Sequence, residues 1–213
     1  DRYKPDNSPT QEQKQRLIDF TKLISSGDDA TFANEIGSFL DLDAFLRFIA
    51  ANTLISNLDS YLGYGHNYYL YLVPETNKFV FIPWDLDLPL ATWPAVGTPE
   101  QLVELSIHHP HAGQNKLIDR LFAIPGHKER YLAIVKELTA TSFTKQRLLE
   151  HLDAIEHALK EPIAKEAKAV AARKEGRGGP GFGMGFGGGQ FGQSMPPRRF
   201  IDKRTESVAA QLA

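Results

Sequence analysis

Two aspartates end a short aromatic segment of this chain. The stretch HNYYLYLVPETNKFVFIPWDLD, residues 66–87, holds two runs of aromatic and β-branched residues around a polar turn, and Asp85 and Asp87 close it. Neighbouring carboxylates repel each other unless a cation lies between them. The pair therefore indicates either a divalent metal site or a turn in which one acid caps backbone amides.

Two further polar residues lie close to this segment. Asn67 opens it, and Asp59 precedes Asn67 by eight residues. If the two runs pair as an antiparallel hairpin, Asn67 and Asp85 meet at its open end, where Asp59 can also reach. Carboxylate and amide oxygens suit Mg²⁺ or Mn²⁺ better than Zn²⁺. Taken singly, Asn67 is better explained as a turn residue and Asp59 as a solvated acid at a helix end.

The elements that must position these residues are predicted to be mostly helical around one β-hairpin, an α+β fold. Residues 67–73 and 79–83 have strand character, and Pro83 closes the second strand. Apolar residues recur at helical spacing in seven segments, and a short helix is expected over residues 99–105. The seven segments are residues 11–25, 28–40, 41–60, 115–123, 127–140, 144–174 and 198–213. The third is the most apolar and should be central.

The C-terminal part of the chain contains two breaks in regular structure. Pro162 should bend or break the helix over residues 144–174. Ten of the seventeen residues from 176 to 192 are glycine, which predicts a flexible loop. We therefore expect one lobe over residues 1–175, a glycine-rich loop over 176–197, and a helix of the same lobe over 198–213. The basic residues flanking the loop are interpreted as solvated, with binding of an acidic protein or a phosphate as the alternative. They are Arg173, Lys174, Arg177, Arg198, Arg199, Lys203 and Arg204.

Composition excludes several function classes. The net charge of -2 gives no broad basic surface, which argues against nucleic-acid binding. No apolar segment is long enough to span a membrane. The absence of cysteine excludes disulfides and thiolate metal sites.

One histidine tract could also bind metal. His108, His109 and His111 lie in HHPHAG, where Pro110 forces an extended chain. No second histidine cluster with a suitable carboxylate follows it, so we interpret the tract as a surface loop.

The stretch NLDSYLGYGHNYYLYLVPETNKFVFIPWDLD resembles the central signature of the spore coat protein H (CotH) kinase family. It has the aspartate, the asparagine before an aromatic strand, and PWD-x-D. The stretches DDATFANEIGSFLDLDAFLRFIAANTLI, NKLIDRLFAIPGHKERYLAIV and FIDKRTESVAAQL also look like that family. The resemblance covers nearly the whole chain apart from the glycine-rich loop. It implies the C-terminal lobe of a protein-kinase-like fold.

The resemblance also implies an activity, which is metal-dependent transfer of phosphate from ATP to a serine of a partner protein. Asp59 looks like the catalytic aspartate that accepts the proton of the substrate hydroxyl. Asn67 and Asp85 look like the residues that hold Mg²⁺ or Mn²⁺ and the nucleotide, with Asp87 a neighbouring or alternative ligand. The substrate would be a coat or extracellular protein, and the location would be the spore coat or the outside of the cell.

Two departures from the family pattern bear on whether this chain transfers phosphate. LPLATW follows the second acid, where family members commonly have a TFG-like turn. No nucleotide-covering lobe precedes Asp1 in this sequence, so we expect the chain alone to transfer phosphate slowly or not at all. Two alternatives therefore stay open: a structural or adhesion module that has lost turnover, and metal-dependent hydrolysis of phosphate esters.

Overall fold

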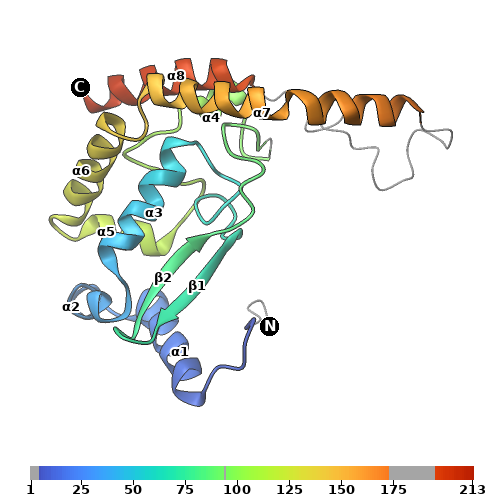
Figure 1. Ribbon diagram of the computed structural model, residues 1–213. Helices are drawn as coiled ribbons and strands as arrows, with labels where there is room; N and C mark the ends of the chain where they lie inside the picture. Colours follow the sequence, from blue (N-terminus) through green and yellow to red (C-terminus); the bar gives the residue numbers. More distant parts are fainter. Residues whose placement is uncertain (1–4, 94, 173–194) are drawn as a thin grey trace.

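A computed structural model describes residues 5–93, 95–172 and 195–213 (Figure 1). Helices dominate it, and its two strands form one antiparallel hairpin, so the predicted α+β class is confirmed. In chain order the elements are α1 (Gln11–Ser26), α2 (Asp29–Phe39), α3 (Leu42–Leu54), β1 (Tyr68–Val73), β2 (Lys78–Pro83), α4 (Pro99–Val103), α5 (Lys116–Ala123), α6 (His127–Ala140), α7 (Lys145–Ala172) and α8 (Pro197–Leu212). Among these helices, none combines the length and apolar character needed to cross a bilayer.

The first three helices begin at polar residues that cap their free amides. The Thr10 hydroxyl accepts a hydrogen bond from the backbone N–H of Gln13, and the Gln13 side chain accepts one from Thr10 N–H in return. The Asp28 and Asp41 carboxylates cap α2 and α3 by accepting hydrogen bonds from the N–H groups of Thr31 and Ala44. Each cap satisfies amides that have no partner inside the helix, which fixes where the helix starts.

Helix α3 lies at the centre of the fold, as predicted. Phe45, Ile49 and Leu54 are buried within it. The hairpin packs on one side of α3, where the ring of Phe81 lies 4.7 Å from that of Phe45, and α6 packs on another (Figure 1). The helix ends at Leu54, earlier than the pattern over residues 41–60 predicts, because Ser56 has a left-handed backbone with φ of 49°.

The hairpin has a buried face and an exposed aromatic face. Tyr68 pairs with Pro83 at the open end, and Val73 pairs with Lys78 at the turn. Phe79 is buried, and its carbonyl accepts a 3.0 Å hydrogen bond from Asp41 N–H, which attaches the hairpin to the start of α3. On the outer face the side chains of Tyr69, Tyr71, Ile82 and Trp84 are exposed.

Helix α8 closes the fold over the end of α3 through one buried cation. Arg204 is fully buried, and its guanidinium donates hydrogen bonds to four backbone carbonyls. The acceptors are those of Thr53, Leu54, Val103 and Leu105, at 2.7 to 3.2 Å. Burial lowers the pKa of Arg204 to about 10. Arg204 therefore joins the ends of α3 and α4 to α8.

The two breaks predicted in the C-terminal part of the chain are the proline in α7 and the glycine-rich loop. Helix α7 runs from Lys145 to Ala172 with Pro162 inside it, so the proline does not break the helix. The side chains around Pro162 are exposed, which leaves water to satisfy the carbonyl that Pro162, lacking an N–H, cannot bond. The predicted glycine-rich loop over residues 176–197 lies outside the described residues except for its end, where Met195 is buried and α8 already begins at Pro197.

Candidate active site

The chain that leaves α3 is fixed by buried polar contacts before it reaches Asp59. The Asn57 side-chain amide donates to Asn52 Oδ1 at 2.9 Å, and Asn57 N–H donates to the Asn52 carbonyl at 2.9 Å. Ser60 Oγ then donates to the Asn57 carbonyl at 2.6 Å. Because Asn52, Asn57 and Ser60 are all buried, these bonds are shielded from water and hold the turn in one conformation.

Asp59 is buried between two polar side chains. Its residue exposure is 5%, and its Oδ1 lies 2.6 Å from Nε2 of His66. An ionised carboxylate only accepts hydrogen bonds, so the imidazole is the donor in this pair. The Asn67 side-chain amide donates to the backbone carbonyl of Asp59 at 3.0 Å. His66 therefore orients the carboxylate of Asp59, while Asn67 closes the loop that carries it.

The loop between Asp59 and His66 turns too tightly for a side chain at one position. A Cβ atom on Gly63 would lie 1.9 Å from the carbonyl oxygen of Leu58. Because that oxygen belongs to the backbone, the chain itself would have to move to make room. Gly63 and Gly65 both donate their N–H groups to the Ser60 carbonyl at 3.2 Å. The close approach at Gly63 is what brings His66 back to Asp59.

Asp85 and Asp87 follow the second strand, but not as an extension of it. Strand β2 ends at Pro83, and Asp85 has a left-handed backbone with φ of 52°. The strand therefore does not continue through the two acids. The chain instead turns at Asp85, and Trp84 N–H donates to the Asn67 carbonyl at 3.0 Å, which keeps Asn67 and Asp85 together at the open end of the hairpin.

The three acids share one electrostatic environment. The side chain of Asp87 is largely exposed, but partial desolvation of its carboxylate is still the main cause that raises its pKa above its ordinary range. The charges of Asp85 and, to a smaller extent, Asp59 raise the pKa of Asp87 further. The charges of Asp59 and Asp85 therefore both act on Asp87, although Asp59 comes from a separate chain segment.

The segment that follows Asp87 is anchored to the end of α3. Leu90 N–H donates to the carbonyl of Ile55 at 2.8 Å, and Ala91 is fully buried. Leu90 and Ala91 both have positive φ, of 59° and 62°. The LPLATW segment thus forms a fixed turn of its own and ties the chain carrying Asp87 to the chain carrying Asp59.

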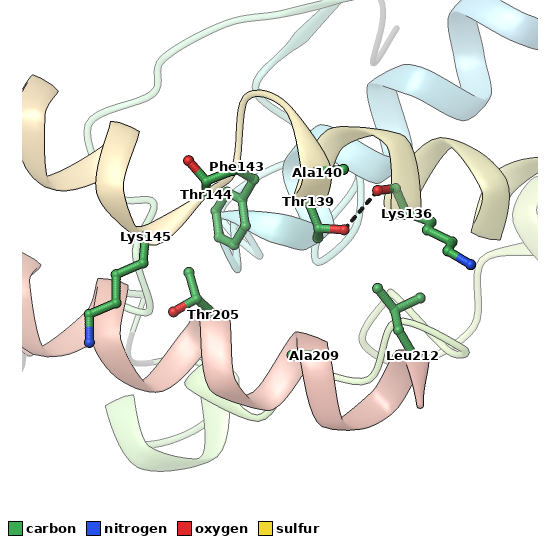
Figure 2. Close-up of a pocket in the computed structure, with 9 residues that line it drawn as sticks. All are labelled: Lys136, Thr139, Ala140, Phe143, Thr144, Lys145, Thr205, Ala209 and Leu212. Carbon is green, nitrogen blue, oxygen red and sulfur yellow. Dashed lines mark hydrogen bonds between the residues drawn. The ribbon is translucent and has the colours of Figure 1, made fainter.

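The donor set at this site fits a hard divalent cation. Asp85 and Asp87 supply exposed carboxylates, and the amide oxygen of Asn67 is not used in its bond to Asp59. Mutual repulsion among the acids would be relieved by a cation between them. A cavity of about 460 Å³ lies elsewhere, between α6 and α8 (Figure 2), and its lining includes none of these residues.

Two contacts of histidine residues were not predicted from the sequence. His66 stands within the quoted segment, but nothing in its spacing indicates a bond to Asp59. The histidine tract is a surface loop for His108 and His109, whereas His111 is buried and its Nε2 lies 2.9 Å from Oδ1 of Asp119. Asp119 follows the tract, in the first turn of α5. This aspartate is the feature of the sequence from which a partner for the histidines could have been predicted.

Comparisons with known proteins match most of the chain. The sequence model of the family described as "CotH kinase protein" matches residues 1–207. The chain is also similar to the inner spore coat protein H of Bacillus subtilis (strain 168), at 39% identity over 84 residues. That alignment covers 39% of this chain and 22% of the relative, so the matched part is about a fifth of the relative's length.

Proposed function

Because the chain belongs to the CotH kinase protein family, we propose that it carries the catalytic segment of a metal-dependent protein serine kinase that uses ATP. The observation that supports this most is that the charges of both Asp59 and Asp85, from two chain segments, act on Asp87. Phosphoryl transfer depends on positioning and on neutralising charge, which such a cluster with a bound cation provides.

Each residue has a separate role in this proposal. Asp59, held by His66, orients the substrate serine and accepts the proton of its hydroxyl. Asn67, Asp85 and Asp87 hold Mg²⁺ or Mn²⁺, which supplies positive charge to the phosphates of ATP when bound. The buried turn from Asn52 to Ser60 keeps Asp59 in place relative to these ligands.

The proposal extends to the fold, the location and the substrate. We place the described helices and hairpin in the C-terminal lobe of a protein-kinase-like fold. A relative is named as an inner spore coat protein, which supports a spore coat location and a coat or extracellular protein as the substrate.

A second candidate is a coat module of the same fold without turnover. The exposed aromatic face of the hairpin favours it, because Tyr69, Tyr71 and Trp84 form an accessible surface suited to binding another protein. In this case the acids would serve only to bind a cation that stabilises the fold.

Transfer of labelled phosphate from ATP by the full-length protein tests the first candidate. We expect incorporation with Mg²⁺ or Mn²⁺ that falls by at least about 100-fold in Asp59→Ala and in Asp85→Ala. Glu75→Ala, at the exposed turn of the same hairpin, is the matched control and should keep full activity. Equal incorporation in all variants would exclude these residues. Absent incorporation together with thermal stabilisation by Mg²⁺ would support the module without turnover.

A further inference from the structure

A second group of metal-ligating side chains lies in the loop between α4 and α5 and in the first turn of α5. His109, His111 and Asp119 each offer one ligand atom, and these atoms all lie within 4.8 Å of one another. The ring centroids of His109 and His111 are 4.2 Å apart. None of the three residues belongs to the acidic cluster at the end of the hairpin.

The loop that carries the histidines is held by hydrogen bonds from its backbone N–H groups. Ser106 Oγ accepts hydrogen bonds from the N–H groups of His108 and His109, at 3.1 and 3.3 Å. Ala112 N–H donates to the Leu62 carbonyl at 2.9 Å, which fixes the other side of His111. The backbone that carries His109 and His111 is therefore set before any ion arrives, and only the exposed imidazole of His109 has to adjust.

The carboxylate partner is fixed as well. Asp119 is in the first turn of α5, and Asn115 caps that helix by accepting a hydrogen bond from Ile118 N–H. Asp119 N–H also donates to the Asn115 carbonyl at 2.8 Å. The capped turn holds the carboxylate of Asp119 beside the imidazole of His111.

His111 has an unusual hydrogen-bonding state. Its residue exposure is 4%, and Nε2 donates to Asp119, but Nδ1 is buried with no hydrogen-bond partner among the described residues. The hydrogen bond to Asp119 involves Nε2 alone. Metal binding at Nε2 would require the imidazole proton to move to Nδ1, where it would break no hydrogen bond among the described residues.

We propose that His109, His111 and Asp119 bind a divalent transition-metal ion of the zinc class. Two imidazole nitrogens and a carboxylate oxygen form a ligand set typical of Zn²⁺, with water or another group in the fourth position. Ligand atoms at bond lengths of about 2.0 to 2.1 Å in a tetrahedral site lie about 3.3 Å apart. The 2.9 Å separation between His111 and Asp119 is close to this value, and the exposed side chain of His109 is free to adjust.

Calorimetric titration of Zn²⁺ into the full chain, prepared without a histidine tag, tests the site. We expect one ion per chain, and at least about tenfold weaker binding in His109→Ala and in Asp119→Asn. Asp119→Asn keeps a hydrogen-bond acceptor for His111 and removes only the charged ligand. His157→Ala, an exposed histidine on α7, is the matched control and should bind as the unchanged protein does.

Two controls separate this site from its alternatives. The same titration in excess Mg²⁺ should be unchanged, because Mg²⁺ prefers oxygen ligands and does not compete for a site built on two imidazoles. Co²⁺ bound in place of Zn²⁺ should give the intense visible absorption of a four-coordinate ion, and that absorption should disappear in His109→Ala. Undetectable Zn²⁺ binding by the unchanged chain, or equal affinity in His109→Ala, would overturn the proposal whether or not the chain is a kinase.

Discussion

The imidazole of His66 donates a 2.6 Å hydrogen bond to the buried carboxylate of Asp59. Replacing His66 by Ala leaves that carboxylate without its donor, and we expect a loss of about 1 to 3 kcal/mol in the free energy of unfolding. Phosphate transfer by the full-length protein should also fall by at least about tenfold, since Asp59 loses its orientation. Urea denaturation and the labelled-ATP assay measure the two effects.

His66→Gln distinguishes a positioning role from simple packing. A glutamine amide can still donate to Asp59, so this variant should recover part of the lost stability and part of the transfer. If His66→Ala and His66→Gln were both as active as the unchanged protein, His66 would have no role in orienting Asp59.

The raised pKa of Asp87 predicts how stability varies with pH. The folded state holds this proton more tightly than the unfolded state, so folding is favoured at low pH. That contribution is lost as pH rises from the ordinary aspartate pKa of about 3.9 through the raised pKa of Asp87. Removing the charge in Asp87→Asn should therefore stabilise the metal-free protein at neutral pH, by less than about 1 kcal/mol because the side chain is exposed.

Thermal unfolding at several pH values in a chelating buffer checks this prediction for Asp87. The advantage of Asp87→Asn should shrink when Mg²⁺ or Mn²⁺ is added, since a bound cation removes the same repulsion. Glu75→Gln serves as the control for loss of one exposed negative charge on the hairpin. Destabilisation by Asp87→Asn at neutral pH without metal would show that the repulsion does not act on this residue.

The fold class was predictable because the helices and the hairpin carry local signals. Thr10, Asp28 and Asp41 are short polar residues placed just before apolar repeats, and all three cap helices. The hairpin likewise follows from two β-branched and aromatic runs around a polar turn. The end of α3 was predicted too late, because the left-handed backbone of Ser56 has no clear mark in the sequence.

Contacts between distant segments were not predictable. The basic residues near the end of the chain were interpreted as solvated, and this is wrong for Arg204, whose partners lie about 100 to 150 positions away. The pairing of His111 with Asp119 and that of His66 with Asp59 also depend on how loops return. Charge and spacing identify residues whose side chains can bind metal or transfer a proton. Which of them are buried together and form hydrogen bonds with each other is decided by the fold.

Arg204 is expected to be among the most important residues for stability. In Arg204→Met the apolar stem is kept and the donors to four carbonyls are lost, which should cost on the order of 3 kcal/mol in the free energy of unfolding. Arg199→Met, on the same helix but exposed with only a 3.8 Å ion pair to Glu100, should change stability by less than about 0.5 kcal/mol. Denaturant midpoints of the two variants give the comparison, and equal midpoints would contradict it.

Gly63 and Gly65 provide a matched pair in the loop that returns His66 to Asp59. Alanine at Gly63 would place Cβ 1.9 Å from the Leu58 carbonyl oxygen, so the loop must shift, and we expect a cost of about 3 kcal/mol. Alanine at Gly65 meets no atom within 4 Å and suffers only the strain of its φ of +68°, about 1 kcal/mol. Because the shift at Gly63 moves the chain next to Asp59, Gly63→Ala should also weaken Mn²⁺ binding and phosphate transfer, whereas Gly65→Ala should affect both much less. Calorimetry with Mn²⁺ and urea denaturation of each variant separate the two cases; equal effects at both positions would mean that the close contact at Gly63 does not hold the site.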